Sequence, residues 1–282
     1  MLHKTASNQI DRAQADAPSR SSEALEDVLE VMRRLRDPKD GCPWDVEQTF
    51  ATIAPYTIEE AYEVADAIER KAMGDLKEEL GDLLFQVVFH ARMAEEQGAF
   101  DFADVAAGLA AKMTARHPHV FGAADVRTAE EQTRAWEDQK AAERGAKRAD
   151  AGVLDDVALN LPALLRAEKL TKRAARIGFD WPDASAVLEK LDEELGELAE
   201  ARGHADADAM ADEMGDVLFV MANLARKIGV DPEDALRRAN AKFTRRFQHI
   251  EARLRANGKT GVQPLEELEA LWVDAKRVER GG

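Results

Sequence analysis

Apolar residues recur at intervals of three and four along most of the chain, a spacing that places them on one face of an α-helix. Ser22 is the predicted N-cap of the first such stripe, which comprises Leu25, Val28, Leu29, Met32 and Leu35. The same spacing predicts further helices over residues 57–70, 75–96, 183–202 and 205–228. No run of alternating β-branched residues is long enough to predict a sheet, so the pattern indicates an all-α fold.

Turn and cap residues refine two places in this pattern. Residues 37–45 contain Pro38, Gly41 and Pro43, which together predict an ordered loop. Thr57 and Glu60 have the spacing of a capping box, which predicts that a helix begins there.

The acidic positions of these helices occur twice. Residues 59–63 (EEAYE) and 79–85 (ELGDLLF) reappear 134 residues later as 193–197 (EELGE) and 213–219 (EMGDVLF). Two later matches lie at nearly the same displacement: Lys112–Arg116 with Lys242–Arg246, and Trp136 and Lys140 with Trp272 and Lys276. We interpret this as a duplication. This duplication divides the chain into a predicted disordered extension (1–22), a first repeat (23–143), a linker (144–152) and a second repeat (153–282).

Composition narrows the functional classes. A chain of 282 residues with 45% hydrophobic and 33% charged residues suits two globular domains. A formal net charge of −16 argues against binding nucleic acid, but a divalent cation can bring a small phosphorylated ligand to an acidic site. One cysteine, Cys42, excludes an internal disulfide, and no apolar run is long enough for a membrane span or signal core. We therefore expect a cytoplasmic protein without a membrane partner.

The acids of the second repeat flank two apolar stripes. Helical wheels place the first stripe at Leu188, Leu191, Leu195 and Leu198, and the second at Met210, Met214, Val217 and Met221. Glu194 and Glu197 flank the first stripe, and Glu213 and Asp216 flank the second. If the two helices pack antiparallel across their stripes, the four carboxylates converge. Such a group must take up protons or bind cations, and oxygen ligands suit magnesium or manganese better than zinc.

A simpler interpretation competes with this metal site. Glutamates on a helix flank are usually a solvated face, and Glu60 is also explained by the capping box. Glu194, its counterpart, lies well inside its helix, where no cap is needed. The recurrence of the acids therefore favours a shared metal site, with a second, weaker set at Glu60, Glu63, Glu79 and Asp82.

Basic and aromatic residues supply candidate ligand contacts. Lys190 lies one turn before Glu194. Ammonium and guanidinium groups beside such a site can bind a polyphosphate, and an indole can stack on a base. The candidates are Lys190, Lys242, Arg245, Arg246, Trp272 and Lys276. The alternative is that residues 242–246 are an ordinary amphipathic surface and that Trp272 belongs to the core.

These residues resemble a known family. The spacing ExxE, fifteen residues, ExxD is similar to that of the all-α nucleotide pyrophosphatases, which include MazG proteins and dimeric dUTPases. The runs at 34–45 (RLRDPKDGCPWD), 116–121 (RHPHVF) and 242–247 (KFTRRF) resemble two-domain bacterial MazG. The resemblance covers nearly all of residues 23–280.

The resemblance implies magnesium-dependent hydrolysis of ribo- and deoxynucleoside triphosphates, with broad base specificity, to the monophosphate and pyrophosphate. It implies that Glu194, Glu197, Glu213 and Asp216 hold the metal and that a water attacks at the α–β linkage. Glu193 is a candidate base. Lys190, Lys242, Arg245 and Arg246 would stabilise the departing pyrophosphate, while Trp272 and Lys276 contact the nucleotide. A homodimer would bury the faces that one module leaves open.

The repeats differ at two cationic positions. Tyr56 stands where the second repeat has Lys190, and Ala115 where it has Arg245. We therefore predict that the second repeat carries most of the hydrolysis, while the first binds metal weakly and mainly builds the dimer. Two alternatives stay open: a regulatory or scaffold protein that binds nucleotide without turnover and acts on an unknown partner, and a narrow dUTP or damaged-nucleotide hydrolase.

Overall fold

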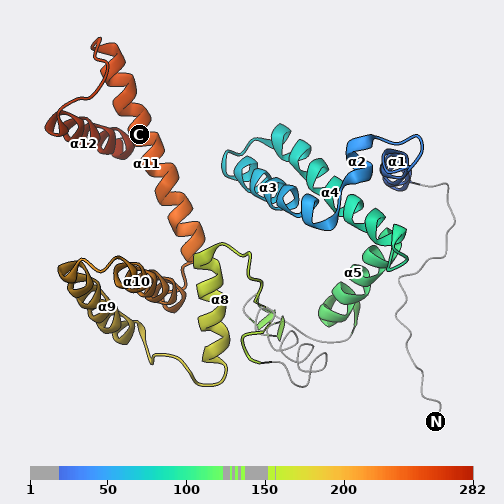
Figure 1. Ribbon diagram of the computed structural model, residues 1–282, viewed down its shortest axis with the longest axis horizontal. Helices are drawn as coiled ribbons and strands as arrows, with labels where there is room; N and C mark the ends of the chain where they lie inside the picture. The colour runs from blue at the N-terminus through green and yellow to red at the C-terminus, as the bar shows by residue number, and fades with distance from the viewer. Residues whose placement is uncertain are drawn as a thin grey trace. The chain divides into compact units, whose positions relative to one another are not determined.

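The computed structural model describes residues 19–122 and 152–281 except 156, together with 128, 131, 132, 135 and 136. Within these residues every regular element is a helix, which confirms the predicted all-α fold (Figure 1). None of the described helices is long and apolar enough to cross a membrane. Contacts divide the chain into two compact units, residues 1–147 and 148–282. The predicted linker lies outside the described residues except for its last residue, Gly152.

The first unit is built around a helical hairpin. Helices α3 (Phe50–Glu69) and α4 (Met73–Glu96) pack side by side along their lengths, joined by a short turn (Figure 1). Helices α1 (Arg20–Leu35) and α5 (Phe102–Arg116) pack against α4, and the short helices α2 (Pro43–Glu47) and α6 (Pro118–Phe121) complete the unit. Its core cluster is Met32, Ile53, Val88, Phe89 and Met93.

The helix starts in this unit differ from the sequence-based expectation. The N-cap of α1 is Ser19, whose side chain accepts from the Ser22 amide, so the predicted start at Ser22 and the predicted extension to residue 22 are too late. The predicted capping box at Thr57 is also wrong. Thr49 and Thr52 form the box that starts α3, and Thr57 lies inside the helix. Glu60 is therefore not a capping residue.

The predicted loop over residues 37–45 ends in helix α2, which has Pro43 in its first turn. Gly41 is required in the loop before it, because a Cβ there would clash with the carbonyl oxygens of Leu35 and Asp37.

The second unit repeats the hairpin and adds a second one. Helices α9 (Ala184–His204) and α10 (Ala207–Lys227) pack together, and α8 (Ala163–Ala175) packs against α10. Asp183 and Asp206 cap α9 and α10. Helix α11 (Pro232–Ala256) then extends away from this pair, and α12 (Leu265–Gly281) folds back along it (Figure 1).

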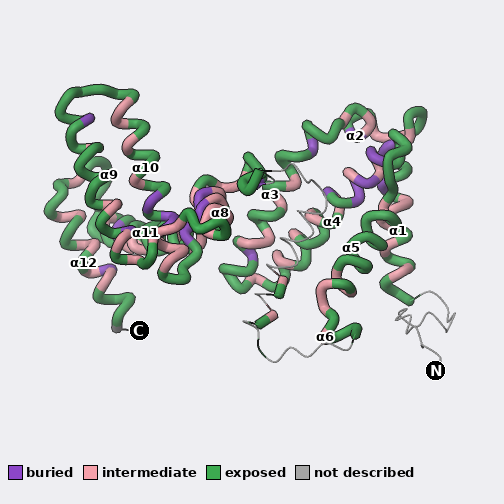
Figure 2. The backbone as a smooth tube through the Cα atoms, turned by 90° about the horizontal axis from the view of Figure 1, so that it is seen from below, coloured by how far each residue is buried: buried purple, intermediate pink, exposed green. Residues whose placement is uncertain are grey.

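The predicted core stripes of α9 and α10 are partly wrong. Leu188, Leu195, Met214 and Met221 are largely exposed, and Figure 2 shows long exposed stretches along both helices. The buried positions are instead Val187, Glu194 and Ala201 on α9 and Val220, Ala222 and Asn223 on α10. Each helix has apolar residues over more than half its circumference. The contact between the two helices buries only some of these apolar residues and leaves the others exposed to solvent.

Candidate metal centre

Three acids of the second unit meet where α9 and α10 pack together. Glu194, Glu213 and Asp216 each offer a carboxylate oxygen, and these oxygens all lie within 4.8 Å of one another. Glu213 and Asp216 share a face of α10 because they are three residues apart. Glu194 comes from the inward face of α9, which the predicted stripe had assigned to leucines.

Glu197, the fourth predicted ligand, is exposed and lies outside the group of three. Partial loss of hydration beside the other acids raises the pKa of the Glu197 carboxyl, and the charge of Glu194 raises it further. Glu197 therefore lies at the edge of the cluster, close enough to feel its charge.

Glu194 is the most unusual member of the cluster. Its side chain is only 7% exposed, and Lys190 Nζ lies 2.8 Å from Oε1. Its buried Oε2 has no hydrogen-bond partner among the described residues. A buried carboxylate oxygen without a donor is costly, and the nearest groups from α10 are also carboxylates. A cation among the three acids would satisfy it, and oxygen-only ligands fit magnesium or manganese.

The first unit has the matching arrangement. Glu60 from α3 and Glu79 and Asp82 from α4 also have oxygens within 4.8 Å of one another, while Glu63 is exposed and outside the group. Burial raises the pKa of Glu60, and the charges of Asp82 and Glu63 add to the effect. Burial and the charge of Glu63 likewise raise the pKa of Glu79. In the first unit the acids are therefore held close enough for their charges to raise the pKa of Glu60 and Glu79.

The two clusters have different neighbours. In the second unit Lys190 contacts Glu194 and also Glu193, which is exposed. In the first unit Gln86 Nε2 donates to Glu60 Oε1 at 3.4 Å, and Thr57 Oγ1 lies 3.0 Å from His90 Nε2. Sequence reasoning did not assign Gln86 or His90 a role, although Gln86 was visible as the only polar residue in the apolar run 83–89.

The cationic candidates of α11 and α12 are not gathered at the acids within one chain. Arg246 pairs with Glu279 at 2.8 Å and lies over the Trp272 ring, which also contacts Phe243. Lys242 and Arg245 share α11 with Arg246, and Lys276 shares α12 with Trp272. Figure 1 shows α12 and the far part of α11 well separated from α9 and α10. Trp272 is half-buried, so it packs against its neighbours without belonging to the buried core.

The equivalent residues of the first unit are only partly described. Lys112 is exposed on α5. Trp136 Nε1 donates to the carbonyl of Arg116 at 3.0 Å, and its ring packs edge-on against His117. Lys140 lies outside the described residues.

Comparison with known proteins identifies one family for both hairpins. The family model of the MazG nucleotide pyrophosphohydrolase domain matches twice, at residues 48–121 and 183–251. Each match contains one hairpin and one acidic cluster.

The chain is also similar to bacterial proteins over most of its length. It is 50% identical over 259 residues to the nucleoside triphosphate pyrophosphohydrolase of Escherichia coli K12, covering 90% of this chain and 98% of the relative. It is 42% identical over 253 residues to the nucleoside triphosphate pyrophosphohydrolase/pyrophosphatase MazG of Thermotoga maritima, covering 89% and 95%. For the nucleoside triphosphate pyrophosphohydrolase of Mycobacterium tuberculosis the identity is 34% over 268 residues, covering 94% and 73%.

Proposed function

Because the chain belongs to the MazG family of nucleotide pyrophosphohydrolases, we propose that it hydrolyses ribo- and deoxynucleoside triphosphates to the monophosphate and pyrophosphate, with magnesium held in the second unit. The observation that carries this proposal is the buried Glu194, which has an unpartnered Oε2 and is grouped with Glu213 and Asp216.

The acids of the second unit have distinct proposed roles. Glu194, Glu213 and Asp216 would hold the metal, and Glu197 would join them from the edge. Magnesium bound there supplies charge neutralisation for the triphosphate and activates water. Manganese has the same ligand preference and is expected to substitute. Glu193 stays a candidate base, and its Oε1 lies 2.8 Å from Lys190 Nζ.

Lys190 is the cation best placed to contact the phosphates. Its ammonium already lies at the acids, 2.8 Å from Glu194 Oε1. An ammonium can turn from a carboxylate to a phosphate oxygen when a divalent cation takes its place. Lys242, Arg245 and Arg246 would stabilise the leaving pyrophosphate, and Trp272 and Lys276 would contact the nucleotide. In this protomer these five lie on the α11–α12 hairpin, so they reach acids only if that hairpin moves or if a second copy supplies it.

We also propose that the protein is a homodimer. The outer side of the α9–α10 hairpin is an apolar groove lined by Leu195, Leu198, Met210 and Met214, with Ala199 and Ala211 between them. Leu195 is 46% exposed and Met214 is 45% exposed in the single chain. A second α9–α10 hairpin offers the same apolar surface, and two hairpins together make a four-helix bundle with a closed core.

Broad base specificity and housekeeping of the nucleotide pool belong to the same proposal. The three grouped acids act on the phosphates, which all nucleoside triphosphates share, and none of them is suited to select a base. A narrow dUTP or damaged-nucleotide hydrolase would turn over only its own substrate. A regulatory protein without turnover would bind nucleotide and release no pyrophosphate. One assay of product formation across canonical and modified triphosphates separates the three.

The decisive experiment compares matched substitutions in the two units. Glu213→Gln keeps the shape of the side chain and removes one charge from the second cluster, and Glu79→Gln does the same in the first. We expect Glu213→Gln to lower pyrophosphate release at least 100-fold, and Glu79→Gln to lower it far less. Full activity in EDTA would refute the metal-dependent mechanism, and the reverse order of the two variants would show that the first unit is the catalytic one.

A further inference from the structure

The first unit carries two exposed aromatic rings for which the proposed hydrolysis has no use. Trp44 of α2 is 50% exposed and Tyr56 of α3 is 42% exposed. Their ring centroids lie 6.2 Å apart, with the planes inclined at 74°. Two adjacent large rings in solvent form an apolar surface of the kind that binds planar ligands.

This aromatic pair adjoins the acidic cluster. Tyr56 precedes Glu60 by one turn and Glu63 by two, so the three share one face of α3 and Tyr56 lies about 6 Å along the axis from Glu60. Aromatic rings and carboxylates therefore form one strip, with a stacking surface at one end and a candidate cation site at the other.

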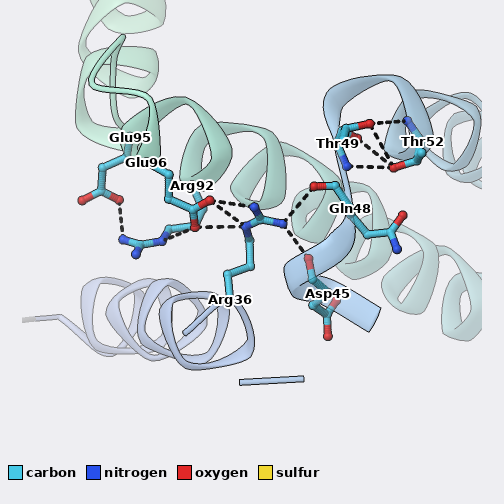
Figure 3. Close-up of polar contacts among 8 residues, drawn as sticks. All are labelled: Arg36, Asp45, Gln48, Thr49, Thr52, Arg92, Glu95 and Glu96. Atoms are coloured by element: carbon cyan, nitrogen blue, oxygen red, sulfur yellow. Dashed lines mark hydrogen bonds and ion pairs between the residues drawn. The ribbon is translucent and has the colours of Figure 1, made fainter. Parts of the chain in front are cut away.

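The segment that presents Trp44 is firmly anchored (Figure 3). Arg36 Nη1 donates to the carbonyl oxygens of Asp45 and Gln48, at 2.6 and 3.3 Å. The other side of the same guanidinium pairs with Glu96, at 2.6 Å from Nη2 to Oε2. Because the side chain of Arg36 is only 8% exposed, α2 is fixed to the core of the unit and Trp44 is held in place before any ligand arrives.

Gln86 indicates that the acidic end of the strip takes a ligand. Its side chain is nine-tenths buried, its Nε2 donates to Glu60, and its Oε1 has no hydrogen-bond partner among the described residues. Its neighbour Glu60 is an acceptor too, so a cation or a donor such as a cation-bound water is needed to satisfy this oxygen.

We propose that the first unit is a second nucleotide-binding site, which takes a nucleoside triphosphate together with a divalent cation and does not cleave it. The base stacks on one of the two rings, Trp44 or Tyr56, and packs edge-on against the other, and the phosphates face the cation held by Glu60, Glu79 and Asp82. This inference rests on the proposed function, because it takes the acidic clusters to bind divalent cations. Retention without cleavage follows from Tyr56 and Ala115, which replace the cations Lys190 and Arg245 of the second unit.

The test uses the full-length chain with Glu194→Gln and Glu213→Gln, which disable the second unit. Calorimetry uses magnesium and an α,β-imido nucleoside triphosphate, which cannot be hydrolysed at the α–β linkage. It is expected to find one remaining binding site per chain. Adding Tyr56→Leu or Trp44→Leu should weaken that binding at least tenfold, because the stacking surface is lost. Tyr56→Phe keeps the ring and should bind normally. Tyr62→Leu is the matched control: Tyr62 is exposed on the same helix but lies about 120° around it.

Two outcomes overturn the inference: no binding by the chain with the disabled second unit, or binding that Tyr56→Leu and Trp44→Leu leave intact. Circular dichroism identifies any variant that has lost its helices, and the Tyr56→Leu and Tyr56→Phe pair remains decisive if Trp44→Leu unfolds the unit. A different result would refute the proposed function. In that case Glu213→Gln alone, in the otherwise unchanged protein, would not lower pyrophosphate release.

Discussion

Lys190 Nζ lies 2.8 Å from Glu194 Oε1, one turn apart on α9. The ammonium therefore occupies part of the space around a buried carboxylate that is grouped with two further acids. At the matching position of the first unit, Tyr56 precedes Glu60 by one turn and supplies no ammonium. The presence of Lys190 is therefore one of the differences between two clusters whose carboxylates are arranged alike.

Lys190→Met is expected to change metal binding and hydrolysis in opposite directions. Without nucleotide, Mn²⁺ should bind about fivefold more tightly, because a competing charge worth about 1 kcal/mol is removed from the acids. With nucleoside triphosphate, kcat/KM should fall about tenfold, because the phosphates lose a cationic contact.

Calorimetry with Mn²⁺ and a pyrophosphate-release assay measure the two effects of Lys190→Met. Lys227→Met is a control that removes a lysine from the far end of α10, where it pairs with Asp180. Weaker Mn²⁺ binding combined with unchanged hydrolysis would show that Lys190 only supports the fold around Glu194.

Arg36→Leu is expected to destabilise the first unit by about 2–3 kcal/mol, because it breaks a largely buried ion pair and removes the donors to α2. Arg33→Leu removes an exposed arginine that pairs with Glu30 on the same helix and should cost less than about 0.5 kcal/mol. Urea unfolding followed by circular dichroism measures both. If the two substitutions lowered the free energy of unfolding equally, the burial of Arg36 would contribute nothing extra to stability.

Asp274 is expected to make the α11–α12 hairpin sensitive to acid. Hydrogen bonds from His249, Arg277 and Arg253 lower the pKa of Asp274 to about 2 from an ordinary value of 3.8. Because the folded-state pKa is the lower one, this contribution is fully present above about pH 4 and is lost as the pH falls toward 2. Asp274→Asn should lower the melting temperature at pH 6, and its difference from the unchanged protein should close near pH 2.

Glu251→Gln, at an exposed position of the same α11 helix, provides the comparison for Asp274→Asn. A difference for Asp274→Asn that stays constant from pH 6 to pH 2 would contradict the assigned pKa.

Leu195→Glu is expected to separate the proposed dimer into monomers, because it places a charge in the apolar groove of α9 and α10. Leu159→Glu is the control, since Leu159 is a more exposed leucine outside these helices. Analytical ultracentrifugation over a range of protein concentrations measures the change. A protein that is monomeric before substitution, or a dimer that withstands Leu195→Glu, would refute this interface.

The sequence by itself determined the helical class, the duplication and the spacing of the acids. Spacing fixes how residues such as Glu213 and Asp216 stand relative to each other on one helix, because helical geometry is the same everywhere. It also indicated that the two repeats differ at Tyr56 and Lys190.

Only the tertiary structure decided which side of each helix turns inward. α9 has apolar residues on both sides of Glu194, so its periodicity allowed either Leu195 or Glu194 to face α10, and the packing of the hairpin selected Glu194. The start of α3 at Thr49 and the anchoring of α2 by Arg36 depend on contacts between residues far apart in sequence, such as the pairing of Arg36 with Glu96. The position of the α11–α12 hairpin away from the acids has the same origin, because local pattern carries no information about the direction in which a helix leaves its neighbours.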